Sequence, residues 1–224
     1  MFDRIARRYD LLNHLLSCGQ DVVWRDRLAA NLPEGPDQCI LDLATGTGDV
    51  LLALNRQGDR VRSTVGLDRS LQMLAIGRDK VRDGNLAQRV TLLVGDVGQL
   101  PFADGSYDAV TMAFGIRNVT DVERTLREAY RVLKPGGRLL ILETSLPSNA
   151  ILRAAYLFYL RHILPHIGAL VSGDGRAYRY LDQTIEAFPY GKAFCADLHA
   201  TGYRKVQAIP LTFGVATLYR ADKP

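Results

Sequence analysis

The stretch over residues 39–49 constrains the fold of this chain more than any other part of the sequence. It opens with a short apolar run, residues 39–44, that is typical of a buried parallel strand. The small residues Thr45-Gly46-Thr47-Gly48 follow at once, and a pattern of helical spacing begins at Val50. Glycine allows backbone conformations that other residues avoid, and it lets a ligand approach the main chain closely. The stretch therefore predicts a strand, a glycine turn and a helix that bind a nucleotide at the carboxyl edge of a parallel sheet.

The kind of nucleotide is less sharply determined by this turn. A dinucleotide fingerprint has a third glycine three residues after the second, and Leu51 stands at that position here. Asp42, inside the strand, can hold the turn from below or receive a cationic ligand. A ligand with an adenosine, a carboxylate and a positively charged sulfonium suits such a site better than one with two phosphates. We therefore favour the methyl donor S-adenosyl-L-methionine, bound by Asp42, Gly46 and Gly48, over a nicotinamide dinucleotide.

The next two predicted strands are followed by acidic residues. A strand over residues 62–67 ends at Asp68, where a ribose would offer its two hydroxyls to the carboxylate oxygens. An alternative role of Asp68, compatible with the first, is to cap the helix predicted from Ser70 onward. A strand over 89–95 is followed by Asp96 and Val97, at the position where an adenine ring would be held.

Strands and helices continue to alternate as far as residue 142. We expect a strand over 107–114, a helix over 122–133 that ends at Lys134-Pro135-Gly136-Gly137, and a strand over 138–142. Segments 204–210 and 212–219 predict a terminal antiparallel pair of strands. The alternation predicts a doubly wound α/β domain. Arg117 and Asn118 follow the fourth strand directly, on the crevice side of such a sheet, where polar residues point at a ligand.

Two helical segments outside this alternation are candidates for covering a substrate. Residues 2–16 place apolar side chains on one face of a helix, as a lid over a pocket or as plain packing, and a second helix begins at Asp21. Residues 150–171 are rich in Leu, Ile, Tyr and Phe, but their Arg and His residues exclude a transmembrane helix. The pattern favours a helix buried against the sheet. The alternative is an apolar wall for a greasy substrate that also touches a membrane surface.

Composition excludes several classes of protein and of site. The chain has 224 residues, enough for one large domain, and its net charge of +4 is not concentrated in a run that would bind nucleic acid. Its three cysteines lack CxxC spacing, which argues against disulfides and a cysteine zinc site. Pro165 interrupts the segment between His162 and His166, and we expect no metal site there. Without a signal-peptide core or a run of membrane-spanning length, we expect a cytoplasmic protein.

Four stretches of the sequence resemble one known family. They are Tyr9-Asp10-Leu11-Leu12-Asn13 with Ser17 and Trp24, Phe114-Gly115-Ile116-Arg117-Asn118-Val119-Thr120-Asp121, Arg131-Val132-Leu133-Lys134-Pro135-Gly136-Gly137 running to Glu143-Thr144-Ser145, and Tyr178-Arg179-Tyr180-Leu181. In order and spacing, over nearly the whole chain, they resemble the ubiquinone/menaquinone biosynthesis C-methyltransferases. The resemblance implies the Rossmann-like class I fold of S-adenosylmethionine-dependent methyltransferases, with a seven-stranded, mostly parallel sheet whose last strand is antiparallel. It also implies methylation of a ring carbon on a polyprenylated quinol.

The resemblance carries over to individual positions of this chain. Thr47, Asp68 and the pair Asp96-Val97 match the donor-binding positions of the family. A further donor-binding position, usually Ser, is Ala113 here, so one hydroxyl contact is missing. The first motif usually has His where Asp21 stands.

Chemistry on a ring carbon suggests roles for Arg117 and Asn118. Carbon is a poor nucleophile unless the neighbouring hydroxyl loses its proton, so the site must favour a phenolate. Arg117 is our candidate for stabilising that phenolate or for acting through a water, and Asn118 for orienting the ring hydroxyl. Because the pKa of an arginine lies above ~12, the electrostatic role is favoured over that of a base. The alternative for Arg117 is a structural ion pair with a helix carboxylate.

These patterns give one methyltransferase domain over residues 1–224. We expect a helical lid over 1–32, a donor-binding core over 33–145, a substrate-covering helical insertion over 146–200 and a strand pair over 201–224. The favoured reaction is demethylmenaquinol to menaquinol, ahead of a benzoquinol or another small hydroxylated aromatic substrate. Peripheral contact with the inner face of the membrane and formation of a homodimer both stay open. The rivals are a nicotinamide oxidoreductase and a non-catalytic donor-binding protein.

Overall fold

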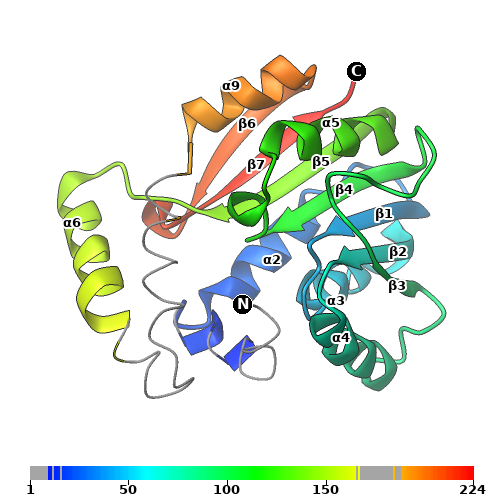
Figure 1. Ribbon diagram of the computed structural model, residues 1–224, viewed down its shortest axis with the longest axis horizontal. Helices are drawn as coiled ribbons and strands as arrows, with labels where there is room; N and C mark the ends of the chain where they lie inside the picture. Colours follow the sequence, from blue (N-terminus) through cyan, green and yellow to red (C-terminus); the bar gives the residue numbers. More distant parts are fainter. Residues whose placement is uncertain (1–9, 12, 16, 165, 167–183, 185–187) are drawn as a thin grey trace.

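One sheet of seven strands organises the described part of the chain, in the order β3-β2-β1-β4-β5-β7-β6 (Figure 1). The computed structural model describes residues 10, 11, 13–15, 17–164, 166, 184 and 188–224. The strands are β1 (Gln38–Leu43), β2 (Val61–Asp68), β3 (Val90–Val94), β4 (Tyr107–Ala113), β5 (Leu133–Thr144), β6 (Arg204–Leu211) and β7 (Ala216–Asp222). The five strands β1–β5 pair in parallel, and β7 is antiparallel to both of its neighbours. The predicted fold class is therefore confirmed.

The strand order creates a crevice in the middle of the sheet. From β1 the chain builds outward through β2 to β3, and it then returns to the other side of β1 to form β4 and β5. Because the connections after β1 and β4 leave in opposite directions, their loops separate at the carboxyl ends of these two strands. Ligands of open α/β sheets bind at this switch point.

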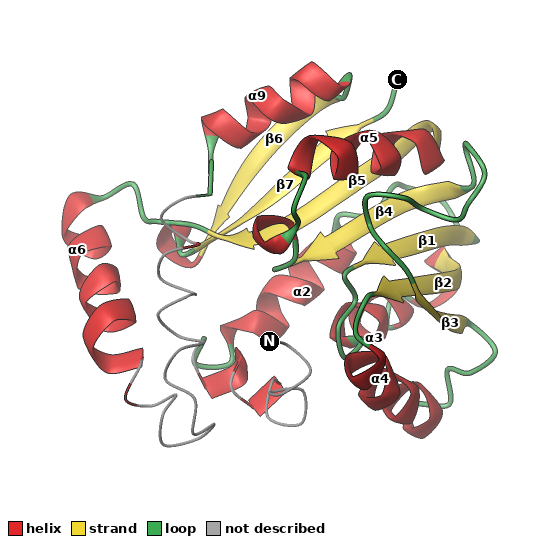
Figure 2. Cartoon of the chain, viewed as in Figure 1, coloured by secondary structure: helices red, strands yellow, loops and turns green. Residues whose placement is uncertain are grey.

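Helices cover both faces of the sheet, as Figure 2 shows. They are α2 (Gln20–Ala30), α3 (Asp49–Asn55), α4 (Leu71–Asp83), α5 (Val122–Val132), α6 (Ala150–Phe158) and α9 (Lys192–Thr201), joined by the short turns η1 (Gly58–Arg60), η2 (Ile116–Asn118), η3 (Tyr159–Ile163) and η4 (Thr212–Gly214). Apolar side chains of α5 and α9 pack on one face, and those of α2 and α3 pack on the other. Full burial of each large apolar side chain stabilises the fold by roughly 1.5–3 kcal/mol.

The central strand β5 shows how sequence period assigns side chains to these faces. Its residues Leu139 and Ile141 belong to the core under α5 and α9, whereas Leu140 and Leu142 belong to the core over α2 and α3. Successive side chains of a strand point to opposite faces. Glu143, the next residue, therefore falls on the α5 and α9 face, at the carboxyl end of the strand.

Strand β5 begins five residues earlier than the sequence predicted. Helix α5 ends at Val132, as expected to within one residue, but Leu133 already pairs with Tyr107 of β4. The register then shifts, because Ala109 pairs with Arg138. The glycine-containing segment after α5 thus ends the helix and forms a bulge within the strand, rather than a loop before it.

Of the two C-terminal strands, the first, β6, matches its predicted range of 204–210 to within one residue, and the second is displaced. The second was expected over 212–219, but residues Thr212–Gly214 form the 3₁₀ turn η4, and β7 runs over Ala216–Asp222. Phe213 has a φ of 58° in this turn, which departs from the extended backbone of a regular strand.

Helix α6 contradicts the favoured prediction of a helix buried against the sheet. It stands apart from the sheet in Figure 1, and its side chains Ile151 and Phe158 are 80% and 58% exposed. The alternative, an apolar wall beside the site, agrees better with this placement. Most of the predicted helix over 2–16 and the motif at 178–181 lie outside the described residues. Among the helices that the structure describes, none has the length and apolarity needed to cross a membrane.

Candidate functional site

A cleft of about 750 Å³ opens at the carboxyl ends of the central strands. Its lining includes Gly46, Asp68, Met73, Asp96, Val97 and Asn118, which come from five different loops and elements. This is the crevice that the strand order creates, and it brings together most of the residues that the sequence singled out.

The glycine turn after β1 forms one wall of the cleft. Gly46 has a φ of 57°, which favours glycine, and a Cβ built on it would meet no atom within 4 Å. Its main chain therefore borders open space on the side of the cleft. The amide of Thr45 donates to the carbonyl of Leu67 at 3.1 Å, which ties the turn to the end of β2.

Asp42 lies beneath the turn and holds it in place. Its Oδ2 accepts a hydrogen bond from the hydroxyl of Thr45, and its Oδ1 accepts one from the hydroxyl of Thr111, both at 2.6 Å. The side chain has no exposed surface, and this burial raises the pKa of the Asp42 carboxyl to about 7. Among the described residues, Asp42 is not part of the cleft lining. Of the two predicted roles, Asp42 therefore has the first: it supports the turn and does not contact a cationic ligand directly.

Asp68, at the end of β2, presents its carboxylate to the cleft. Its Oδ2 accepts from the amide of Gly46 and its Oδ1 from the amide of Ser70, both at 2.8 Å. Each oxygen keeps a second lone pair, and two lone pairs suffice for the two hydroxyls of a ribose. The prediction that Asp68 caps the next helix is wrong, since the cap of α4 is Ser70, whose hydroxyl accepts from the amide of Met73 at 3.1 Å.

Asp96 and Val97 border the cleft after β3. The exposed Asp96 carboxylate accepts from the amide of Gly98 at 2.8 Å and lies 3.5 Å from the guanidinium of Arg69. Val97 is buried and, with Met73 of α4, lines the cleft with apolar surface. A flat apolar ring with a hydrogen-bond donor at its edge fits between these groups.

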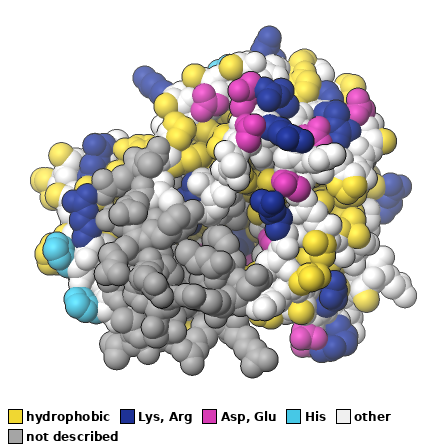
Figure 3. Space-filling model, in the orientation of Figure 1, with side chains coloured by type: hydrophobic (Ala, Val, Ile, Leu, Met, Phe, Trp, Pro, Cys, Tyr) yellow, Lys and Arg dark blue, Asp and Glu magenta, His cyan; other side chains and the backbone are white. Residues whose placement is uncertain are grey.

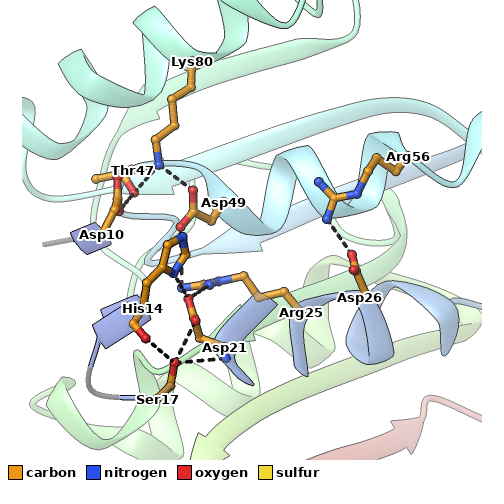
Figure 4. A network of polar contacts seen from close by, with 10 residues as sticks. All are labelled: Asp10, His14, Ser17, Asp21, Arg25, Asp26, Thr47, Asp49, Arg56 and Lys80. Atoms are coloured by element: carbon orange, nitrogen blue, oxygen red, sulfur yellow. Dashed lines mark hydrogen bonds and ion pairs between the residues drawn. The ribbon is translucent and has the colours of Figure 1, made fainter. Parts of the chain in front are cut away.

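Thr47 and Gly48 lie behind the cleft, outside its described lining. The hydroxyl of Thr47 donates to Asp10 at 2.6 Å and accepts from Lys80 at 3.1 Å (Figure 4). Lys80 also forms ion pairs with Asp10 at 2.7 Å and with Asp49. Thr47 thus joins the glycine turn to α4 and to the N-terminal segment.

The same network continues into α2 and accounts for an unusual residue there. Asp21, which stands where the resembling family usually has His, is buried and accepts from Ser17 at 2.8 Å and from Arg25. His14 lies 2.6 Å from the same carboxylate (Figure 4). Burial opposes ionisation of Asp21, but the hydrogen bonds from Arg25, Ser17 and His14 outweigh it and lower its pKa.

Arg117 and Asn118, in the turn η2 after β4, form a second polar group beside the cleft. The Nη1 of Arg117 donates to the Oε1 of Glu143, and both side chains are almost fully buried. The ion-pair alternative for Arg117 is therefore observed, but its partner lies at the end of strand β5 and not on a helix. Asn118 lines the cleft and donates to the carbonyl of Phe114 at 3.2 Å.

Three buried polar atoms of this group have no partner among the described residues. They are the Nε of Arg117, the Oδ1 of Asn118 and the Oε2 of Glu143. Buried polar atoms are nearly always hydrogen-bonded, so three together indicate a place that a polar ligand or water completes.

Glu143 and Tyr156 also belong to this group and were not predicted as site residues. Burial raises the pKa of the Tyr156 hydroxyl, and the charge of nearby Arg117 opposes that rise. An acidic residue at the carboxyl end of a central strand is a usable signal for Glu143. No local pattern distinguishes Tyr156 from the other aromatic residues of its segment.

The residues of the cleft fit the methyl donor. The carboxylate with free lone pairs suits a ribose. The apolar slot beside a second carboxylate suits an adenine, and the glycine main chain that faces open space suits the amino-acid moiety. A SAM-dependent methyltransferase from Aquifex aeolicus has the same fold with a TM-score of 0.65, at 18% identity over 89% of each chain. The fold is that of the S-adenosylmethionine-dependent methyltransferases.

Sequence comparison identifies the family within this class. The ubiE/COQ5 methyltransferase family matches residues 1–223. The demethylmenaquinone methyltransferase of Thermus thermophilus is 46% identical over the full length of both chains. The ubiquinone/menaquinone biosynthesis C-methyltransferase UbiE of Geobacter sulfurreducens is 44% identical over all of this chain and 87% of its own length. This chain belongs to the ubiE/COQ5 methyltransferase family, and its cofactor is S-adenosyl-L-methionine.

Proposed function

We propose that this enzyme methylates a ring carbon of a polyprenylated quinol and converts demethylmenaquinol to menaquinol. The observation that carries the proposal is the buried polar group of Arg117, Asn118 and Glu143 beside the donor cleft. A ring hydroxyl would accept a hydrogen bond from the Nε of Arg117 and donate one to one of the two unpaired oxygens. The names of the relatives support a quinol, and the name of the Thermus thermophilus protein favours the naphthoquinol ring. Names that include ubiquinone keep a benzoquinol as the second candidate.

The donor half of the cleft would bind the cofactor through residues that the sequence singled out. Asp68 would hold the ribose, Asp96 and Val97 the adenine, and the main chain at Gly46 the remaining part. When bound, S-adenosylmethionine supplies an electrophilic methyl group to the ring carbon. Asp42 and Thr47 would act from behind, because they hold the turn that carries Gly46.

The acceptor half would activate and orient the ring. Arg117 would stabilise the phenolate through its guanidinium, and Asn118 would orient the ring hydroxyl from the cleft wall. Well-oriented reactants can lower the barrier by ~7–11 kcal/mol, so positioning would supply much of the rate enhancement. Fixed charges aimed at the developing charge would add to it.

The helical segments would enclose the substrate. Residues 1–32 would form a lid that Asp10 joins to the glycine turn, and residues 146–200 would cover the acceptor side. Helix α6 exposes the apolar residues Ile151 and Phe158, and no acidic residue occurs between 144 and 173. Figure 3 shows hydrophobic, basic and His side chains together at the edge where α6 lies. This surface would contact the membrane that holds the polyprenyl tail.

Parallel assays with two acceptors test the proposal. The protein is incubated with isotope-labelled S-adenosylmethionine and either demethylated naphthoquinol or demethylated benzoquinol of equal tail length, under reducing conditions. We expect label on a ring carbon of the naphthoquinol. Label on the benzoquinol alone would move the substrate to ubiquinone-type rings, and label on neither would refute the proposed function.

A further inference from the structure

We propose that Glu143 takes the proton of the ring hydroxyl during methyl transfer, while Arg117 holds the resulting phenolate. The inference rests on the proposed function, because it names the proton acceptor of that reaction. The two oxygens of the buried Glu143 carboxylate differ in the number of hydrogen bonds that they accept.

The two oxygens of Glu143 differ completely in their hydrogen bonding. The Oε1 accepts from Arg117, from the amide of Thr144 at 2.7 Å and from the hydroxyl of Thr144 at 3.0 Å. The Oε2 has no partner among the described residues, although the side chain is only 1% exposed. A desolvated carboxylate oxygen without a donor is unfavourable, and a substrate hydroxyl that delivers a proton to it removes this penalty.

The fold places this oxygen next to the wall of the donor cleft. Ala113, which lines the cleft, pairs with Leu142 across strands β4 and β5, and Glu143 follows Leu142 directly. Its partner Arg117 precedes Asn118, which lines the same cleft. The unpaired Nε of Arg117 can donate to the oxygen of a ring hydroxyl whose proton is accepted by the Oε2 of Glu143, and the Oδ1 of Asn118 is left for a second donor such as water.

The other titratable groups nearby are less suited to accept the proton. The guanidinium of Arg117 carries five N–H donors and no acceptor, so it cannot take the proton. Tyr156 of α6 and Tyr219 of β7 also act electrostatically on this group, but burial raises the pKa of both hydroxyls, so they stay protonated. Among the four described His residues, His14 is bound to Asp21, the ring of His162 packs on Phe158 of α6, and His166 and His199 are exposed.

The proposed sequence of bond changes balances. The O–H bond of the ring hydroxyl breaks, its proton passes to the Oε2 of Glu143, and its electron pair stays on the ring. The adjacent ring carbon bonds to the methyl group as the donor's carbon–sulfur bond breaks, and that electron pair remains on sulfur. The C–H bond at the methylated carbon then breaks, its proton leaves to solvent, and the ring oxygen recovers the proton held by Glu143.

The isosteric variant Glu143→Gln tests the chemical role of the carboxylate. It keeps an oxygen that can accept from Arg117 and Thr144 but cannot take a proton. We expect turnover to fall about 10²–10⁴-fold, with binding of S-adenosylhomocysteine unchanged. The matched control is Glu128→Gln, another arginine-paired carboxylate, which lies on α5 and should leave turnover unchanged.

Substrates with a more acidic ring hydroxyl separate proton transfer from positioning. An electron-withdrawing substituent on the ring makes the hydroxyl ionise without help, so the defect of Glu143→Gln should shrink with such acceptors. A defect of equal size with every acceptor would mean that Glu143 only positions Arg117, and the proposal would fail. Wild-type turnover equal to that of Glu143→Gln would refute it as well. Absence of turnover in the wild type would instead refute the proposed function.

A binding measurement without the methyl donor gives an independent readout. A nitronaphthol absorbs at longer wavelength as its phenolate, so its spectrum reports ionisation in the site. Ionisation of the bound probe should release no proton to the buffer in the wild type, because Glu143 keeps that proton, whereas it should release one proton in Glu143→Gln, with Glu128→Gln matching the wild type. Equal proton release on ionisation of the probe in all three proteins would contradict proton transfer to Glu143, whether or not a quinol is methylated.

Discussion

The donor and acceptor halves of the cleft satisfy their buried carboxylates in different ways. Under the glycine turn, both oxygens of Asp42 accept hydrogen bonds from threonine hydroxyls. On the other side, one oxygen of Glu143 accepts three hydrogen bonds and the other accepts none among the described residues. Both carboxylates are buried and both stand at or near the ends of central strands.

The difference shows that the hydrogen bonds of the donor half are already formed before a ligand binds, whereas those of the acceptor half are not. The donor half is preorganised, so it binds its ligand without rearranging its own hydrogen bonds. The acceptor half keeps unpaired polar atoms in a desolvated place, where electrostatic interactions are stronger than in water. Interactions that are completed only as charge develops on the substrate favour the transition state over the ground state. Substitutions in the two halves should therefore affect binding and chemistry separately.

Arg117→Ala should have the largest effect on turnover, with donor binding left near normal. Without the guanidinium the phenolate loses its stabilising charge, and we expect turnover to fall about 10³-fold or more. Calorimetric affinity for S-adenosylhomocysteine should stay within about twofold of wild type, because Arg117 lies outside the donor half.

The loss of one partner from a buried ion pair also destabilises a protein, typically by ~3–5 kcal/mol. Arg117→Lys, which keeps the charge, therefore accompanies Arg117→Ala, and both are assayed below their unfolding temperatures. Lost donor affinity with turnover intact would reverse the assignment of the two halves.

Asp42→Asn should change the pH dependence of stability. Burial raises the pKa of the folded Asp42 to about 7 from an ordinary value of 3.8. Between these values the unfolded chain has released the proton and the folded chain retains it, so stability falls as pH rises, by up to about 1.4 kcal/mol per pH unit. Asp42→Asn removes this contribution. In denaturant titrations, its stability relative to wild type should increase from pH 4 to pH 7 and level off above.

Asp79→Asn, an exposed aspartate on α4, is the control for this titration. Parallel curves for wild type and Asp42→Asn would contradict a raised pKa at Asp42. The same experiment sharpens the comparison of the halves, because it measures how much the ionisation of a buried, fully hydrogen-bonded carboxylate lowers the free energy of unfolding.

Asp68→Ala should weaken donor binding without a defect specific to chemistry. It removes two charge-assisted hydrogen bonds to the ribose, each worth ~1.5–3 kcal/mol, so affinity for S-adenosylhomocysteine should fall about 10²-fold or more. At saturating donor, turnover should recover to near wild type. Asp79→Ala should leave affinity unchanged, and an Asp68→Ala protein that binds normally would remove the ribose role.

Gly46→Ala should have the smallest effect. The φ of Gly46 is 57° and that of Gly105 is 63°, and a Cβ at either position meets no atom within 4 Å. Both substitutions should therefore lower stability similarly, by ~1–2 kcal/mol, through backbone strain. Only Gly46→Ala places its methyl group in the cleft, and we expect about a tenfold loss of donor affinity in this variant alone. Equal affinities in the two variants would show that the donor does not approach the turn.

The parts of the site that local sequence predicts share one property. The glycine turn and Asp68 follow parallel strands directly, and all parallel strands of one sheet end at the same edge. Strand pattern and chain order therefore bring them together without knowledge of any side-chain contact. Arg117 and Asn118 were predicted at the crevice for the same reason.

The ranges that failed were those in which local signals compete with pairing. Lys134-Pro135-Gly136-Gly137 ends a helix by local rules, but pairing of Leu133 with Tyr107 makes the same segment a bulge in β5. The apolar residues of α6 resemble a core helix by composition, yet the two faces of the sheet are already covered by α2, α3, α5 and α9. A sheet face that is already covered has no room for a further helix.

By itself, the sequence determined the sheet, the donor cleft and the class of ligand, because periodicity and glycine placement act over a few neighbouring residues. Tertiary structure alone decided that Arg117 meets Glu143, 26 positions away, and that Thr47 meets Asp10. It also decided which oxygen of Glu143 is left without a donor. Such contacts depend on strand order and on which face each side chain takes, and these follow from packing the whole chain around one sheet.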